Sequence, residues 1–546
     1  MQPIHRVPQP VFLVKRRNCD AHPHDIVPSD SGTLTTVSHA SSVSLDSSVT
    51  AENDISVSRF KDIWGCLMVI VAVLILYSFL PLGSAIQFGG DEGYELMKGF
   101  LVSKGFKLYQ AIWSDQPPVF SVLLGCAFKL WGPSMLTARL IAAGFGLLLF
   151  GTFFQLVYLR IGRRAAFLAT FFLLASPAIL EISVSVMQEV PAFGTALAAT
   201  LFLFRWRKHR HWAWLIASGA VMGIALGIKL TAILIAPAML VEIALASQSD
   251  QKRLWLKPAV LSAVQWTGSV VIIFGIVNFL WGRGSAESSW KAHFSEHTAF
   301  GSQTPEDFPM PVSVFLDHSE CVGAAIVGLI SIAHRRRWRE FAFPLTILGT
   351  ALGIHFVHRP WWMYYYLHIA IPMAWLAGFA VNETVARLSV LFAKIQLNRL
   401  SKKTWQGIGL SALIALVLVR SEGRLESGLK DLSERGRIKN SLVLAKMREY
   451  TDQSHWAYAQ FGDEAYPFNA RLPMPPELAV VTLKRFWSGQ ITVEKIVEIC
   501  QRYQVEELLL DSSRINYEWD ALLNDYDIVY KDKMFTLYVA RRIRPK

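Results

Sequence analysis

The 546-residue chain is 52% hydrophobic and only 18% charged, and it carries a net charge of +12. Soluble domains have about 25% charged residues, so this composition excludes an ordinary soluble protein and indicates an integral membrane protein. Its Lys and Arg residues cluster at the ends of apolar runs, which reports membrane orientation and argues against a nucleic-acid partner. The five cysteines are scattered without a CxxC pair, so they predict neither a zinc site nor a disulfide framework.

Three regions follow one another along the chain. Residues 1–60 are rich in Ser, Thr, Asp and Pro and lack the apolar core of a signal peptide, so we expect a disordered cytoplasmic tail. Residues 61–420 contain repeated apolar runs long enough to cross about 30 Å of hydrocarbon, which predicts a membrane domain of about 11 transmembrane helices. The expected spans are 63–86, 136–158, 165–183, 188–204, 212–228, 230–246, 258–281, 312–333, 340–357, 364–384 and 405–420.

One further apolar stretch, residues 119–132, is too short to span and contains Lys129. We interpret it as an interfacial or re-entrant helix. This choice places all the basic clusters that close the apolar runs on one face, which the positive-inside rule makes cytoplasmic. Residues 87–135 then form one long loop on the outer face, and the C-terminus also lies outside.

Residues 421–546 read as a soluble domain on that outer face. Helix-like segments such as ITVEKIVEICQRY alternate with strand-like segments such as HWAYAQF, VEELLLD and the closing pair YDIVYKDKMFTLYVARR. The predicted fold class is therefore an α-helical polytopic membrane protein with a small C-terminal α/β domain.

This topology gathers a small set of ionisable residues at the outer membrane boundary. Such groups are costly at membrane depth unless they face a cavity or one another, so we expect them to converge on one hydrated pocket. Carboxylates facing cations suit chemistry on an anionic substrate. The set comprises Asp91, Glu92, Asp115, Arg139, Glu189, Lys229, His355, His358 and Arg359.

The stretch DEGYELMKGFLVSKGFKLYQAIWSDQPPVFSVLLGCAFKLWG, followed by TARLIAAGFGLL, resembles the C-type glycosyltransferases (GT-C). The resemblance is to the branch of protein O-mannosyltransferases and lipid A aminoarabinose transferases. In that branch an Asp-Glu pair follows the first span, an acidic residue or His precedes Pro-Pro, and an Arg opens the second span. Here these features are Asp91-Glu92, Asp115 before Pro117-Pro118, and Arg139.

The resemblance implies an enzyme with the GT-C fold in the plasma (inner) membrane. It would move a sugar, with inversion, from a polyprenyl (dolichyl or undecaprenyl) phosphate carrier to a hydroxyl of a lipid, glycan or protein acceptor. Because the lipid phosphate is already a good leaving group, one carboxylate base suffices, unlike the carboxylate pair of a glycosidase. No cofactor is expected, and a divalent metal at the carboxylates is left open.

The same resemblance suggests roles for individual residues. Asp91 is assigned as the general base and Glu92 as a group that orients the loop or the acceptor. Asp115 and Glu189 match by position the other acidic residues of the family's pocket. The expected binding residues for the carrier phosphate are Arg139, Lys229 and Arg359. Independently of the resemblance, the aromatic and basic stretch HRPWWMYYYLH predicts a wall that stacks on sugar and holds phosphate, with His358, Arg359, Trp361 and Tyr364 as its candidates.

Two departures from the family pattern bear on these roles. The aminoarabinose transferases have a Lys after the acidic residue of the outer loop, where this chain has Gln116. They also have an Asp directly before Pro at the third outer turn, whereas Glu189 here is separated from Pro191 by Val190.

Plainer interpretations compete with each assignment. Acidic residues favour the first turn of a helix, so Asp91 and Glu92 are also suited to helix capping. Asp115 fits a turn before proline, Lys229 fits a side chain that reaches the interface, and the aromatic residues fit an interfacial belt. For the whole chain, the alternatives are a secondary transporter or lipid-sugar flippase and a non-catalytic assembly subunit.

Overall fold

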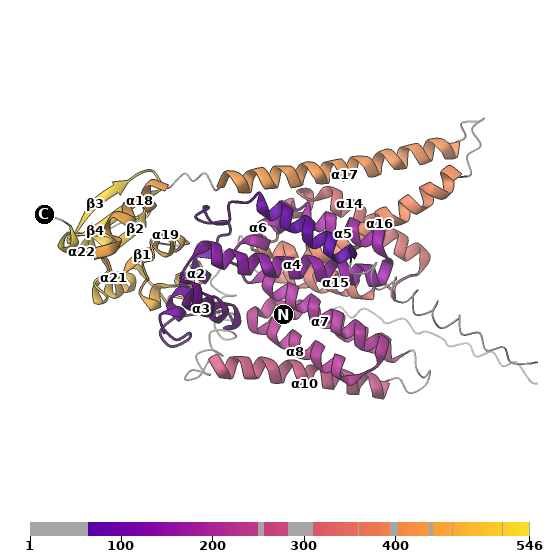
Figure 1. Ribbon diagram of the computed structural model, residues 1–546, viewed down its shortest axis with the longest axis horizontal. Helices are drawn as coiled ribbons and strands as arrows, with labels where there is room; N and C mark the ends of the chain where they lie inside the picture. Colours follow the sequence, from indigo (N-terminus) through magenta and orange to yellow (C-terminus); the bar gives the residue numbers. More distant parts are fainter. Residues whose placement is uncertain are drawn as a thin grey trace, which may run out of the picture. The chain divides into compact units, whose positions relative to one another are not determined.

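The computed structural model describes residues 64–248, 256–281, 309–358, 360–393, 402–435, 441–460, 462–515 and 517–544. The chain divides into two units, 1–59 and 60–546, and everything described below belongs to the second unit (Figure 1). The predicted disordered tail at 1–60 lies outside the described residues.

The membrane domain is a bundle of helices of unequal length (Figure 1). In the described residues, four stretches are long and apolar enough to cross a membrane. They are α4 (Met135–Ile161), the 3-10 helix η1 (Leu230–Ile235) continued by α9 (Ala236–Ser247), α10 (Leu256–Trp281), and η4 (Met363–Tyr365) continued by most of α16, together Met363–Val390. Shorter apolar helices are Trp64–Ser78, α3 (Val119–Trp131), α8 (Trp212–Ile228) and α15 (Ala342–Val357). The chain is therefore an integral membrane protein, while the count of eleven spans stays a prediction.

The expected span at 165–183 is two helices rather than one. Helix α5 (Arg163–Leu174) and helix α6 (Pro177–Val184) meet at 81°. Pro177 has no N–H to continue a helical ladder, and the Ser176 hydroxyl instead accepts a hydrogen bond from the Ile179 N–H as an N-cap. A proline after a capping serine therefore ends one helix and starts the next.

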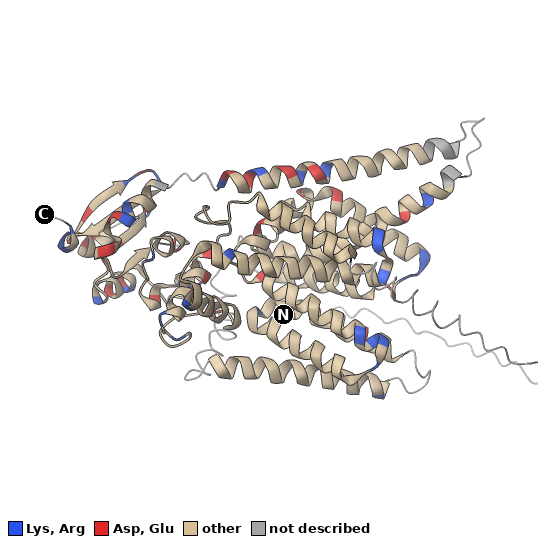
Figure 2. Cartoon of the chain, viewed as in Figure 1, with Lys and Arg blue, Asp and Glu red and all other residues tan. Residues whose placement is uncertain are grey.

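Basic helix ends meet at one end of the bundle (Figure 2). Buried Glu242 of α9 pairs with Arg160 of α4 and with Arg207 of α7 (Glu189–His209). Glu383 of α16 (Tyr366–Ala393) pairs in the same way with Arg335 of α14 (Ser319–Arg335). Since α7 runs from Glu189 to this basic end, Glu189 marks the opposite end of the bundle.

At that opposite end the chain forms a helical hairpin of α2 (Glu92–Ser103) and α3. The two helices pack closely because glycines face the neighbouring side chains. A Cβ at Gly99 would lie 2.7 Å from Leu124 Cβ, and one at Gly125 would lie 2.4 Å from Val102 Cγ1. The predicted short helix at 119–132 is thus present as α3, packed on α2.

The C-terminal domain is an α/β module, as its alternating pattern predicts. Helix α17 (Lys402–Arg435) runs continuously through the predicted domain boundary at 421. The sheet has the order β1-β2-β4-β3, with β1 and β2 parallel and the other pairs antiparallel. Its elements are α18 (Ser441–Tyr450), β1 (Ala457–Ala459), α19 (Ala465–Asn469), α20 (Leu483–Trp487), α21 (Val493–Arg502), β2 (Glu507–Asp511), β3 (Tyr526–Lys531) and β4 (Phe535–Ala540).

Candidate active site

A cavity of about 350 Å³ lies where the loop 87–135, the starts of α2 and α7, the segment before α16, and the C-terminal domain meet. From the membrane domain its lining includes Asp91, Glu95, Lys98, Asp115, Gln116, Gln188, Glu189, Lys229, Trp362 and Tyr364. From the C-terminal domain it includes Gln460, Asp463, Thr482, Lys484, Asp511 and Arg514. Five of the predicted site residues thus line the same cavity: Asp91, Asp115, Glu189, Lys229 and Tyr364.

Asp91 occupies the N-cap position of α2, but its side chain makes no capping hydrogen bond. Its carboxylate instead lines the cavity together with Tyr364. Burial raises the pKa of Asp91 to about 6, against the lowering effect of Lys229, while Glu189 and Asp115 add to the rise. A carboxylate with such a pKa is ionised at neutral pH and is a stronger base than an exposed one.

Lys229 and Glu189 form a buried ion pair across the cavity wall. The Lys229 ammonium also lies 4.7 Å from the centre of the Tyr364 ring. Only 8% of Lys229 is exposed, so it does not reach toward the interface. Because the carboxylate of Glu189 balances the positive charge of Lys229, the pair presents no net charge to a ligand in the cavity.

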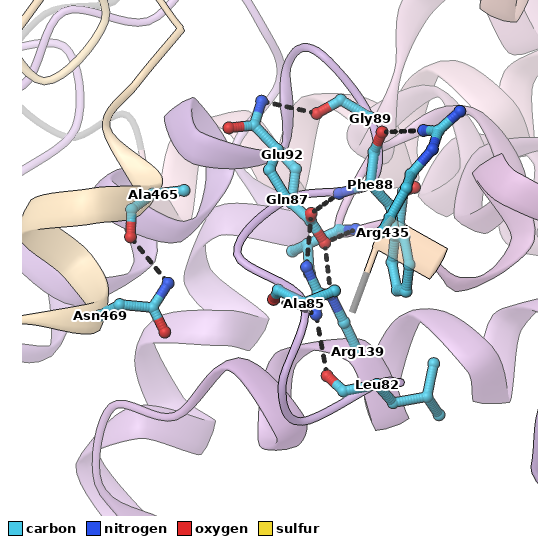
Figure 3. Close-up of polar contacts among 12 residues, drawn as sticks. Leu82, Ala85, Gln87, Phe88, Gly89, Glu92, Arg139, Arg435, Ala465 and Asn469 are labelled. Atoms are coloured by element: carbon cyan, nitrogen blue, oxygen red, sulfur yellow. Dashed lines mark hydrogen bonds and ion pairs between the residues drawn. The ribbon is translucent and has the colours of Figure 1, made fainter. Parts of the chain in front are cut away.

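Glu92 and Arg139 form a second pair that does not line the cavity (Figure 3). Both are fully buried, and two bonds of 2.9 Å join the Arg139 Nε and Nη2 atoms to the carboxylate. Arg139 Nη1 donates to the Leu82 and Ala85 carbonyls, and Glu92 also accepts from the backbone N–H of Phe88. Arg139 is therefore placed as an anchor of the loop before α2, away from the position expected of a phosphate ligand.

The aromatic segment after α15 divides in two. Trp362 and Tyr364 line the cavity, whereas Trp361 lies behind it, edge-on to His355 with ring centres 4.9 Å apart. His358 is exposed and is not part of the cavity lining. Arg359 lies outside the described residues.

Several residues that line the cavity are not among the site residues predicted from the sequence. Glu95 and Lys98, joined at 2.7 Å, stand at the i,i+3 spacing typical of a helical ion pair. Gln188 is 2% exposed, and neither of its side-chain polar atoms has a partner in the described part of the chain. Residues from the C-terminal domain are brought in by tertiary structure alone.

Within the described ranges, no group of three or more His, Cys, Asp and Glu side chains is arranged to hold a metal ion. In the sequence, His293, Glu296 and His297 of the stretch HFSEHTAF have the residue types of metal ligands, although a solvated loop is the plainer interpretation, and they lie outside those ranges. A divalent metal is therefore not assigned to particular ligands.

A family model described as dolichyl-phosphate-mannose-protein mannosyltransferase matches residues 115–281. No curated protein sequence matches the chain. Among solved structures, ArnT from Cupriavidus metallidurans in the apo state matches with a TM-score of 0.61 and 17% identity, over 88% of this chain and 99% of that chain.

The same ArnT bound to undecaprenyl phosphate matches with a TM-score of 0.56 and 16% identity, over 88% of this chain and 99% of that one. The oligosaccharyltransferase of Archaeoglobus fulgidus in the apo form matches with a TM-score of 0.54 and 14% identity, over 83% of this chain and 70% of that one. The likeness extends over more than four fifths of this chain and shows that it has the GT-C fold.

Proposed function

We propose that this protein is a membrane glycosyltransferase that moves a sugar from a polyprenyl phosphate carrier to an acceptor hydroxyl. One observation carries the proposal. Asp91 stands where it would cap α2, yet its carboxylate points into a cavity with Asp115, Glu189 and Lys229 and has its pKa raised to about 6. The carrier class is supported by the shared fold with an ArnT that binds undecaprenyl phosphate and by the mannosyltransferase family match.

In the proposed reaction the acceptor oxygen attacks the anomeric carbon of the sugar from the side opposite the phosphate. The new carbon–oxygen bond forms as the bond to the carrier phosphate breaks, and the phosphate leaves with the electron pair. The acceptor proton passes to Asp91. Attack from the opposite side inverts the anomeric centre, and one carboxylate is sufficient because the phosphate needs no proton to leave.

The other residues hold the reactants. Asp115 and the Glu189–Lys229 pair offer hydrogen bonds to sugar hydroxyls, and Trp362 and Tyr364 provide an aromatic wall. Glu92 acts as a positioning residue, because its bonds to Arg139 and to backbone N–H groups fix the loop that carries Asp91. We place the protein in the plasma (inner) membrane, with its N-terminus in the cytoplasm and its C-terminal domain outside.

The test is transfer in reconstituted vesicles. Purified protein is supplied with radiolabelled sugars on undecaprenyl and dolichyl phosphate and with lipid, glycan and peptide hydroxyl acceptors, with and without EDTA. We expect that at least one of the carrier-linked sugars is transferred to an acceptor. Loss of transfer in the presence of EDTA would show that the reaction needs a divalent metal. Carrier-dependent uptake of label into sealed vesicles without transfer would support a transporter instead.

A further inference from the structure

The cavity needs a cation for the carrier phosphate, and most of its cations are already paired. Lys229 is neutralised by Glu189, Lys98 by Glu95 and Arg514 by Asp511. Arg139 is bound to Glu92 outside the cavity. Gln116 stands where the aminoarabinose transferases have a Lys, so the outer loop adds no cation there.

Lys484 of α20 differs from these cations. It lines the cavity from the C-terminal domain, and in the described part of the chain its ammonium has neither a carboxylate within 4.0 Å nor a hydrogen-bond acceptor. Two residues earlier, the Thr482 hydroxyl lines the same cavity, is buried and has no hydrogen-bond partner in that part of the chain. A buried unsatisfied hydroxyl costs about 1–3 kcal/mol, so these two donors together point to an anionic ligand.

The segment that carries these donors is held from both sides. The Tyr94 hydroxyl of α2 donates to the Val481 carbonyl at 3.0 Å. Arg485 donates to the Val480 carbonyl at 2.6 Å, and its guanidinium lies 4.7 Å from the centre of the Trp113 ring in the outer loop. Lys484 is therefore preorganised relative to the membrane domain although it belongs to the C-terminal domain.

The position of Lys484 also suits a lipid headgroup. The ring of His358 is partly desolvated, which lowers its pKa, and the positive charge of Lys484 lowers it further, so the Lys484 ammonium lies within range of a charge–charge interaction with this ring. His358 directly follows the apolar helix α15. The ammonium is thus on the side of the bundle where α15 ends, which is the side on which the phosphate of a membrane-embedded carrier would meet the cavity.

We infer that Lys484 and the Thr482 hydroxyl bind the phosphate of the polyprenyl carrier, so that the C-terminal domain completes the donor site instead of only covering it. The inference rests on the proposed function and deepens it. During transfer the phosphate gains one negative charge as the bond to the sugar breaks. An ammonium beside it stabilises that charge more strongly in the product than in the donor.

The test measures binding separately from transfer. Binding of undecaprenyl phosphate, undecaprenol and inorganic phosphate to the detergent-solubilised protein is measured by native mass spectrometry. The variants are Lys484→Gln, Lys484→Arg and the control Lys495→Gln, which removes an exposed lysine of α21 in the same domain. Thermal unfolding shows that each variant is folded.

We expect Lys484→Gln to weaken undecaprenyl phosphate binding about tenfold or more, as for loss of one charged hydrogen bond. Lys484→Arg keeps the charge and should stay within about threefold of the unchanged protein. Binding of undecaprenol should be equal in all variants, and Lys495→Gln should bind like the unchanged protein.

Equal undecaprenyl phosphate affinity in Lys484→Gln and the unchanged protein would overturn the inference, even if the unchanged protein transfers sugar. If Lys484→Gln weakens the binding of inorganic phosphate but not of undecaprenyl phosphate, the inference is also overturned, because the site then binds a free anion and not the carrier. If the phosphate-dependent loss appears but no carrier sugar is ever transferred, the binding site stands and the proposed function fails.

Discussion

At the scale of single residues, the local environment assigns different roles to two neighbouring carboxylates. Asp91 faces a cavity, and Glu92 faces a buried arginine and two backbone N–H groups. The sequence resemblance predicts that both belong to the site. It assigns Asp91 as the base and Glu92 as a group that orients the loop or the acceptor. It does not predict that Glu92 faces away from the cavity, because adjacent residues at a helix start point in directions that only the packing of α2 determines.

The raised pKa of Asp91 predicts the pH dependence of the reaction. A base acts only when deprotonated, so kcat/KM should be constant above about pH 6 and fall tenfold per pH unit below it. Steady-state transfer measured from pH 4.5 to 8 checks this. Asp463 also lines the cavity, and burial and the charge of Asp511 raise its pKa to about 7, so its titration could be mistaken for that of Asp91. If Asp91 is the base, the variant Asp463→Asn keeps the inflection near pH 6. An inflection near 4 would show that Asp91 is solvated like an ordinary carboxylate.

Glu92→Gln should act through stability. It leaves the Arg139 guanidinium buried with a neutral partner, and breaking such a pair costs roughly 3–5 kcal/mol. We expect a clear fall in the Tm measured by differential scanning fluorimetry in detergent. The matched control is Glu426→Gln at an exposed position of α17. An unchanged Tm with lost transfer would give Glu92 a direct part in the chemistry.

At the scale of elements, the sequence predicts which segments are apolar better than it predicts where a helix is interrupted. The apolar run at 165–183 predicts one span, but Ser176 and Pro177 break it, and the bend of 81° follows from capping chemistry that a hydropathy window ignores. The four strands and α21 of the C-terminal domain lie within predicted segments, because short runs rich in β-branched and aromatic residues and an amphipathic helix leave a clear pattern in the sequence. What the sequence cannot predict is that this domain lines the cavity, since Thr482 and Lys484 belong to no recognisable motif.

The contact between α2 and α19 is tight at Gly93. A Cβ at this position would lie 3.0 Å from the Ala465 backbone N and 3.2 Å from Glu464 Oε2. Gly93→Ala should therefore cost about 1–3 kcal/mol by overpacking and lower the Tm. Gly144→Ala on α4, where a Cβ has no neighbour within 4 Å, is the control and should leave the Tm unchanged or slightly higher. Equal Tm values for the two variants would contradict the close packing.

At the scale of the whole molecule, the basic helix ends lie at one end of the bundle and the cavity lies at the other. Helix α7 begins at Glu189 in the cavity and ends in a basic turn that pairs with Glu242. Sequence reasoning predicts this separation from the positive-inside rule, and the ion pairs of α4, α7 and α9 bring the basic ends together. The direction of the whole bundle in the membrane follows as a proposal from the same rule.

Cysteine labelling tests the proposed orientation. In a background with the native cysteines replaced, Lys495→Cys should react with a membrane-impermeant maleimide in intact cells. Lys208→Cys, exposed in the basic last turn of α7, should react only after the membrane is opened. The reverse pattern would place the cavity on the cytoplasmic face.

The central claim is that Asp91 removes the acceptor proton. Its most direct test is the single-turnover rate of sugar transfer from donor-saturated protein, for the unchanged chain, Asp91→Asn and the exposed control Asp452→Asn. We predict a loss of about 100-fold to 10,000-fold for Asp91→Asn, with donor affinity retained, and no loss for Asp452→Asn. Transfer by Asp91→Asn at the unchanged rate would contradict the assignment.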